Sequence, residues 1–304
     1  MVTGQNAAAA AASARQPVTW CTLGFLGRWV FSSRSLIGAL PNGVVSALDK
    51  TSAAFFALLF PDECRICGVP LTNISRIPVC RACLRKPEPL SADYFCVLCR
   101  MPFLNPAPLD AEGRCELCRR GLRGFDSAYS FGAYEGVLRE LVHLFKYSRI
   151  RPLAGPLGEL LATAIPRDQT FDAIVPVPLH WRRRWQRGFN QSALLAQAIA
   201  RRFGIPIRNS LRRTRATATQ AGLTNSNRRL NVAGAFLVKR KRDVEGRRIL
   251  LVDDVMTTGA TAAACAAALK GAGARYVALL TLARVDRRTS AIPFAGRSLA
   301  VGAA

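Results

Sequence analysis

The sequence predicts an α/β fold in which helices flank a parallel sheet and a small cysteine-rich module precedes it. Short apolar runs such as residues 249–252 contain β-branched residues, are typical of strands buried on both faces, and alternate with segments of helical periodicity. Four Cys-x-x-Cys pairs lie ahead of them, within residues 64–118. With 304 residues and 50% apolar content, the chain can bury one large core or two modest ones.

The central stretch of the chain is RILLVDDVMTTGAT, residues 248–261. Asp253 and Asp254 follow its apolar run. Two adjacent carboxylates at the end of a buried strand are costly unless they face solvent, a cation or hydroxyl donors, so we place them at the mouth of a site. In open α/β sheets, ligands bind at the carboxyl ends of strands, where this turn lies.

Small residues, hydroxyls and a glycine follow the acids and precede an alanine-rich helix expected over residues 262–269. Backbone N–H groups and a helix N-terminus at such a turn can cradle a phosphate that a bulky side chain would block. The alternative is a buried strand followed by a capped helix that binds no ligand. Both interpretations keep the strand and the helix.

The eight cysteines of the four pairs predict metal sites; they are Cys64, Cys67, Cys80, Cys83, Cys96, Cys99, Cys115 and Cys118. Each pair can present two thiolates from a tight knuckle, which indicates two tetrahedral Cys₄ sites for Zn²⁺. Because a closed Cys₄ site leaves no open coordination position, we expect structural zinc, with dithiol redox chemistry as the alternative. The first pair can join the second and the third the fourth, or the pairs can cross.

Residues 61–121 are too short and too rich in Pro, Gly and Arg for a core of their own, so bound metal should supply much of their folding free energy. The cysteine pairs also fit a reducing cytosol better than a disulfide framework. No run of eighteen apolar residues exists, and the N-terminal segment lacks the basic and apolar regions of a signal peptide. We therefore expect a cytoplasmic protein without an integral membrane segment.

Charge is concentrated in one part of the chain. The formal net charge is +24, and residues 180–248 hold eighteen Lys or Arg against Asp243 and Glu245, a local net of +16. Such a stretch predicts a polyanionic partner. A diphosphorylated sugar and a nucleic acid both satisfy it, and charge alone does not choose between them.

The rest of the chain predicts tails, connections and further elements around an α/β domain at 125–286. Residues 1–41 and 287–304 are typical of tails, the first disordered or of low complexity. Residues 42–60 carry an irregular apolar stripe, which indicates a helix that packs on the next module or binds a membrane surface or partner. The other expected segments are a link at 121–132, helices at 134–147 (with Lys146 placed to suit the helix dipole), 155–164 and 191–203, and strands at 171–179 and 275–283.

Two resemblances extend this interpretation. Residues 248–261 resemble the signature of type I phosphoribosyltransferases that binds PRPP, 5-phosphoribosyl 1-pyrophosphate. The stretches VPVPLHWRRRWQRGFNQ (175–191) and LRRTRATATQAGLTNSNRRLNVAGAF (211–236) resemble the ComF family, which is associated with DNA uptake in competence. A cysteine-rich ribbon ahead of a transferase-like domain matches that family too, so the resemblance covers residues 58–284.

The first resemblance implies roles for the central stretch. Asp253 and Asp254 would hold the ribose hydroxyls. The turn after them would hold the 5′-phosphate through Met256, Thr257, Thr258, Gly259, Ala260 and Thr261. The expected catalytic residues are Asp253, Asp254 and Arg187.

The second resemblance carries over two loops. The first includes Arg183, Arg187, Gly188, Phe189, Asn190 and Gln191. The second includes Arg213, Thr217, Gln220, Leu223, Arg228, Asn231 and Phe236. Arg183 and Arg187 would clamp the pyrophosphate bidentately, and Mg²⁺ would bridge the diphosphate and the ribose hydroxyls. Without a ligand, the first loop is a solvated basic loop, and residues 210–234 are either a lid over the diphosphate or a connecting hairpin.

The resemblance implies displacement of pyrophosphate from carbon 1 of PRPP by a nitrogen nucleophile, through an oxocarbenium-like transition state. No residue identifies the acceptor. A rival hypothesis is a non-enzymatic DNA-uptake factor that contacts single-stranded DNA through its basic loops or meets proteins of the competence machinery. A third is a regulator that senses PRPP without turnover.

Overall fold

The structure, a computed structural model, describes residues 62–71, 75–120, 122, 124–180, 185, 187–214 and 234–285. All of them fall within one of the two compact units into which the chain divides, Ser52–Ala304. The expected tails, the expected helix at 42–60 and most of the expected lid therefore lie outside the described residues.

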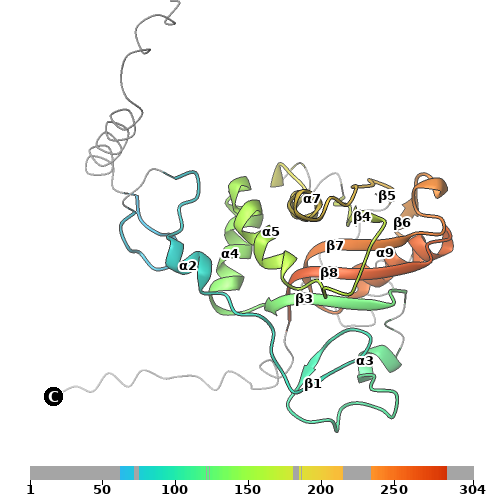
Figure 1. Cartoon of the computed structure of the whole chain (residues 1–304). Helices are drawn as coiled ribbons and strands as arrows, with labels where there is room; N and C mark the ends of the chain where they lie inside the picture. Colours follow the sequence, from blue (N-terminus) through green and yellow to red (C-terminus); the bar gives the residue numbers. More distant parts are fainter. Residues whose placement is uncertain are drawn as a thin grey trace, which may run out of the picture. The chain divides into compact units, whose positions relative to one another are not determined.

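Four parallel strands form the central sheet (Figure 1). In spatial order they are β3 (Ser127–Ala133), β8 (Tyr276–Arg284), β7 (Arg248–Met256) and β4 (Ala173–Pro176). A bridge between Ile174 and Ile207 continues the parallel pairing beyond β4. The expected parallel sheet is confirmed, and its strands end at a common edge because all of them run in the same direction.

Strands β7, β4 and β3 show the main differences from the prediction. β7 continues past Val252 through both acids, because β8 is long enough to pair with it as far as Arg284. β4 stops at Pro176, since the prolines at 176 and 178 lack the N–H that further pairing needs. The expected link at 121–132 was wrong in its second half, which forms the edge strand β3 against β8.

Helices cover both faces of the sheet. The longest among the described residues are α4 (Gly136–Tyr147), α5 (Ala154–Ala162), α7 (Gln191–Phe203) and α9 (Ala260–Gly271). Leu250 and Val252 of β7 share one core with α4, α5 and α7, whereas Ile249 and Leu251 share the other with α9. Successive strand residues point to opposite faces, so this alternation sorts the two cores.

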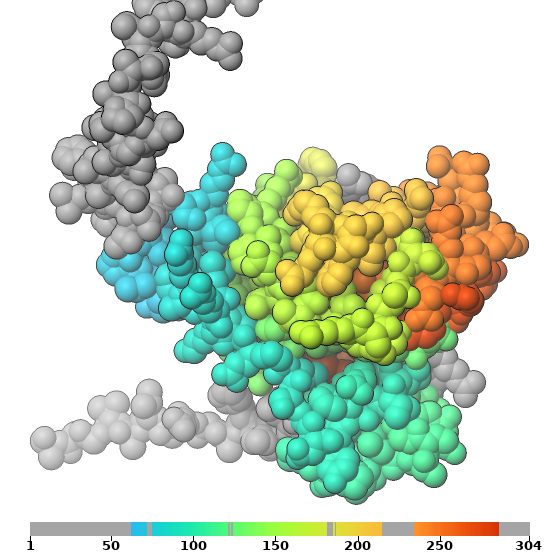
Figure 2. Space-filling view, in the orientation of Figure 1, coloured from blue at the N-terminus to red at the C-terminus, as the bar shows by residue number. Residues whose placement is uncertain are grey.

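The cysteine module contains only short elements. They are α2 (Arg81–Arg85), β1 (Tyr94–Phe95), β2 (Pro102–Phe103), which pairs antiparallel with β1, and α3 (Glu116–Arg119). Cys64, Cys80 and Cys83 of its first half adjoin the core of α4, α5 and α7, and its last four cysteines join the core of α9. Figure 2 shows the two halves, in blue and in teal, as two regions of the surface joined by the segment between them.

The base of the expected lid is the antiparallel pair of β5 (Leu211–Arg213) and β6 (Phe236–Val238). Residues 215–233, which distinguish a lid from a connecting hairpin, lie outside the described residues. The single turns η1 (Arg151–Leu153) and η2 (Lys241–Asp243) complete the described chain. Within that part of the chain, no helix has the length and apolar character needed to cross a membrane.

The close packing of α5 on α7 gives a first prediction. A Cβ at Gly158 would lie 2.2 Å from the Cβ of Ala198, so Gly158→Ala should force the helices apart and lower the free energy of unfolding by about 1–3 kcal/mol. Gly155 lies in the same helix, and no atom lies within 4 Å of the carbon that Gly155→Ala would add. This substitution should leave the free energy of unfolding unchanged or raise it slightly. Urea unfolding measures both, and equal stabilities of the two variants would contradict the close approach.

Candidate functional site

The acid pair lies at the common edge of the sheet and its two carboxylates have different partners. The hydroxyl of Ser192, in the first turn of α7, donates to Asp253 Oδ1 at 2.9 Å. Lys146 Nζ, in the last turn of α4, lies 2.9 Å from Asp254 Oδ1. Both side chains of this ion pair are largely buried. The acids are therefore held by two helices that belong to the same face of the sheet.

Sequence reasoning missed Lys146 as a site residue. The sequence analysis related this lysine only to the dipole of its own helix. The one local signal for a site role is that a cation stands in the last turn of an amphipathic helix. Burial opposes the charge of Lys146, but the charge and hydrogen bond of Asp254 outweigh burial and raise its pKa. The lysine is thus a fixed cation beside the acid pair.

Asp253 has a perturbed pKa. Burial and then the neighbouring charge of Asp254 raise it to about 7, although the Asp254 backbone N–H and the Ser192 hydroxyl act in the opposite direction. The site therefore holds one carboxylate compensated by Lys146 and a second that exchanges its proton near neutral pH. Groups with such shifts are concentrated at functional sites.

The turn after β7 has the backbone of an anion cradle. Gly259 precedes α9 with a φ of +76°, a conformation that favours glycine. A Cβ there would also lie 2.8 Å from Met256 Cε and 3.0 Å from Leu122 Cδ1. The backbone N–H of Ala260 donates to Thr258 Oγ1 at 3.4 Å, which closes the turn.

A cavity of about 40 Å³ lies against this turn and reaches Asp253. Asp253 contributes to its lining, together with the predicted residues Met256, Thr257, Gly259, Ala260 and Thr261. Thr258, the remaining member of the predicted set, is buried in the same turn. The structure thus brings the predicted ribose and phosphate residues together at one helix N-terminus.

Part of the basic loop reaches the same edge. Arg187 Nη1 donates to Gln191 Oε1 at 3.4 Å, and its guanidinium lies 5.4 Å from the ring centre of Tyr147. Gln191 is fully buried, and its Nε2 has no hydrogen-bond partner among the described residues. The carbonyl of Gly188 accepts from Arg151 at 3.0 Å. Arg187, Gly188 and Gln191 therefore lie close together, and Gln191 Nε2 is a buried donor without a partner among the described residues.

The other predicted loop residues separate into two groups. Asn190 immediately precedes α7 and its side chain makes no cap bond; its Nδ2 donates to Val177 O at 3.0 Å and so ties the loop to the end of β4. Phe189 packs on Phe145, and Arg213 and Phe236 lie in β5 and β6. The predicted positions outside the described residues are Arg183, Thr217, Gln220, Leu223, Arg228 and Asn231.

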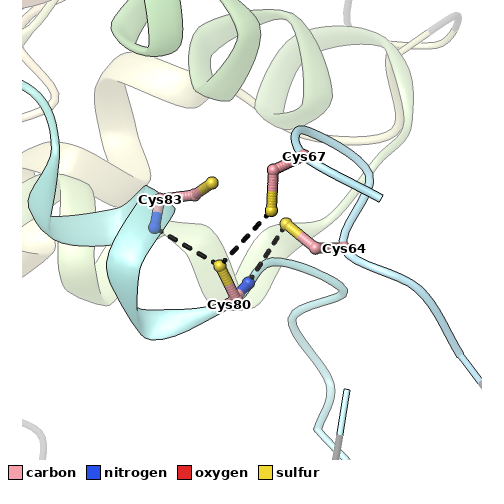
Figure 3. Close-up of side chains that lie close together, drawn as sticks. All are labelled: Cys64, Cys67, Cys80 and Cys83. Atoms are coloured by element: carbon pink, nitrogen blue, oxygen red, sulfur yellow. Dashed lines mark hydrogen bonds between the residues drawn. The ribbon is translucent and has the colours of Figure 1, made fainter. Parts of the chain in front are cut away.

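The cysteines form two sets of four, first pair with second and third with fourth, and not a crossed arrangement. Figure 3 shows the first set, in which Cys67 and Cys80 sulfurs are 3.8 Å apart. In the second set the sulfur separations are 3.7 Å for Cys96 and Cys118 and 3.6 Å for Cys99 and Cys115. A Zn–S bond of about 2.3 Å gives a tetrahedron edge of about 3.8 Å, so both sets fit Zn²⁺.

Backbone donors favour thiolates in these sets. The N–H of Cys80 donates to Cys64 Sγ at 3.3 Å, and the N–H of Cys115 donates to Cys96 Sγ at 3.4 Å. Burial opposes ionisation of Cys64, but backbone N–H groups outweigh it and lower its pKa to about 6. Sulfurs more than 3.5 Å apart are not disulfide-bonded, so the donor sets are those of metal sites and not of a disulfide framework.

Comparison with known proteins assigns the class first. The family model described as the phosphoribosyl transferase domain matches residues 190–294, which contain the acid pair and the glycine turn. Together with the parallel sheet, this match defines a protein with a phosphoribosyltransferase fold. A solved structure of glutamine PRPP amidotransferase from B. subtilis is 24% identical in sequence, and the match covers 43% of this chain and 26% of the amidotransferase chain. Its TM-score of 0.31 is too low to bear on function.

Two curated relatives are more informative. The DNA utilization protein YhgH of Escherichia coli K12 is 33% identical over 228 residues, which are 73% of this chain and 83% of the relative. Competence protein F of Haemophilus influenzae is 36% identical over 169 residues, 53% of this chain and 73% of the relative. The chain belongs to the ComF family.

The metal sites give a second prediction. Anaerobically purified full-length protein should contain two zinc ions per chain by elemental analysis, because each cysteine set is closed and separate. Replacement of Cys64 and Cys67 by Ser should remove one ion and leave the other. A metal-free wild-type protein, or loss of both ions in this variant, would contradict two independent sites.

Asp253 gives a third prediction, on pH. Between pH 4 and pH 7 the folded chain keeps a proton on Asp253 that the unfolded chain releases, so this group makes stability fall as pH rises through that window. The free energy of unfolding of the wild type, taken relative to that of Asp253→Asn, should therefore fall by up to about 1.4 kcal/mol per pH unit between pH 4 and pH 7. Above pH 7 this difference should level off. Urea unfolding across this range measures it; a difference that is constant with pH would contradict the shifted pKa.

Proposed function

We propose that this chain binds PRPP, or another ribose phosphate, at the common edge of the sheet, and that with Mg²⁺ it releases pyrophosphate to a nitrogen nucleophile. One observation carries the proposal: the acid pair, the small cavity and the positive-φ Gly259 at the start of α9 follow one another within a single strand–turn–helix segment. Hydroxyl acceptors and a phosphate cradle at this spacing suit a sugar that carries a 5′-phosphate.

The acid pair would accept hydrogen bonds from the ribose hydroxyls. Lys146 holds Asp254 through its 2.9 Å ion pair, and Ser192 orients Asp253. In the proposed complex, backbone N–H groups of residues 257–261 would hold the 5′-phosphate. The carboxylates are hard oxygen ligands that suit Mg²⁺, which would neutralise diphosphate charge through waters that it retains.

The diphosphate would lie against the basic loop. Arg187 supplies the charge, and the unpaired Nε2 of the buried Gln191 supplies a donor. We extend the proposal to Arg183, Gln220 and Arg228 from the family resemblance alone. Since the transition state develops positive charge on the sugar, catalysis needs alignment of the leaving pyrophosphate more than a covalent nucleophile.

The family suggests a cellular role. The relatives are named for DNA utilization and competence. We propose that this chain works in the cytoplasm on DNA uptake or nucleotide metabolism, with a zinc-bound module at 61–121 and a phosphoribosyltransferase-like domain at 125–286.

A second candidate function is binding of single-stranded DNA without turnover. Trp185 and Tyr147 are 87% and 64% exposed, and the Arg187 guanidinium lies over the Tyr147 ring. Exposed aromatic rings among arginines are what base stacking uses. Calorimetric titration with PRPP, with and without Mg²⁺, decides between the two: Mg²⁺-dependent saturation supports the ribose-phosphate site, whereas salt-sensitive binding of any single strand, without PRPP binding, supports the alternative.

The acid pair gives a fourth prediction. Asp253→Asn with Asp254→Asn should lower PRPP affinity at least a hundredfold, because amides are weaker acceptors for the hydroxyls and poor partners for Mg²⁺. The matched control, Asp243→Asn with Glu245→Gln, makes the same charge change within the basic stretch and should retain affinity. Zinc content should be equal in all three proteins. Equal PRPP affinity of the two variants, measured by calorimetry, would remove the ribose role from the acids.

A further inference from the structure

We infer that the second cysteine set, Cys96, Cys99, Cys115 and Cys118, positions the phosphate-binding turn, with Leu122 and Arg284 as the residues that transmit its metal occupancy. The inference rests on the proposed function for what the turn binds. Its structural content rests on contacts between the metal module and the segment from β7 to α9.

Leu122 makes the first of these contacts. It follows Cys118 by four residues, its N–H donates to Leu117 O at 3.0 Å, and its side chain is buried. Its two methyl carbons lie 3.0 and 3.2 Å from the position that a Cβ on Gly259 would occupy. The side chain of Leu122, just after the second cysteine set, therefore fills the space directly against the glycine of the turn.

The chain stays against α9 after Leu122. At Gly124, with a φ of +120°, an added Cβ would lie 2.6 Å from Ala263 O and 3.1 Å from Ala267 N. Contacts this short involve backbone atoms, which cannot move aside without moving the helix. The segment after the second cysteine set is thus packed against the first turns of α9, directly after the phosphate-binding turn.

Arg284 makes the third contact, from the sheet. It ends β8 opposite Met256 in the β7–β8 register, so it lies beside the start of the turn. Its side chain is 1% exposed; Nη1 donates to the carbonyl of Cys99, and Nη2 lies 3.3 Å from Met101 Sδ. A guanidinium beside the turn therefore reaches into the second cysteine set.

The charge of Arg284 makes this contact sensitive to metal. No carboxylate among the described residues forms an ion pair with this buried guanidinium, and its Nε has no hydrogen-bond partner there. Four thiolates and one Zn²⁺ carry a net charge of −2, which would supply the missing counter-charge. With thiols and no metal, a cation would stay buried without compensation, and the contact would weaken.

The first cysteine set provides a matched comparison. Cys64 and Cys83 lie in the core of α4, α5 and α7, on the other face of the sheet from α9. Neither Leu122 nor the turn belongs to that core. Loss of metal from the first set should therefore leave the turn in place.

Hydrogen exchange of the zinc-loaded full-length protein, read by mass spectrometry, tests the inference. In Leu122→Ala, and in Cys115→Ser with Cys118→Ser, amides of residues 256–263 should exchange at least tenfold faster than in wild type. Cys64→Ser with Cys67→Ser should leave their exchange unchanged, and α7 peptides should stay protected in all proteins, which reports that the domain is folded. Exchange of residues 256–263 that is unchanged in Leu122→Ala would overturn the inference.

Two further readouts separate this inference from the proposed function. Titration of PRPP should show at least tenfold weaker binding in Leu122→Ala than in wild type; equal binding would overturn the coupling while the proposed function stands. If wild type binds no PRPP, the proposed function fails and the exchange experiment still decides the coupling. In Arg284→Met, zinc should leave the second cysteine set for a chelator at least tenfold faster than in wild type, while release from the first set stays the same. An unaltered rate at the second set would show that Arg284 does not transmit its metal occupancy.

Discussion

Two adjacent carboxylates held within a paired strand are the constraint on which the site depends. The register of β7 with β8 runs from Arg248 opposite Tyr276 to Met256 opposite Arg284, so the backbone of both acids is fixed on that side. Each carboxylate meets a different helix there, Asp253 meeting α7 and Asp254 meeting α4, although both helices cover the same face of the sheet. A free loop would let the charges separate in solvent. The ladder instead keeps them together and gives the following turn a fixed starting point.

The sequence allowed the sheet, the acid pair, the glycine turn and the two metal sets to be predicted, because each has a local signal. The bounds of α7 agree with the predicted helix since Gly204 ends it in a left-handed conformation. Lys146 could not be predicted as a site residue, because its partner, Asp254, lies 108 positions later in the chain. A lysine in the last turn of a helix is also accounted for by the helix dipole alone. β3 was missed because Ser127–Ala133 has no aliphatic run, and its pairing with β8 decides its conformation.

The pairing of the cysteines was open for a different reason. Sequential and crossed arrangements have the same ligands, so only the path of the chain distinguishes them. The sequential arrangement lets the first set adjoin one core and the second set the other. Metal bound at each set would therefore stabilise a different face of the sheet. In a crossed arrangement, each ion would join cysteine pairs from both halves of the module, and the two faces would not be stabilised separately.

The edge strand β3 has a consequence for synthesis of the chain. Its partner among the described strands is β8, and Ser127 pairs with Ala278, about 150 positions later. The cysteine module and β3 leave the ribosome first and can take up metal early, whereas Arg284 emerges only after the rest of the sheet. Pairing between such distant segments is slow. A nascent chain that bound metal at this stage would have its thiolates protected while the apolar faces of its strands still lacked their last partner.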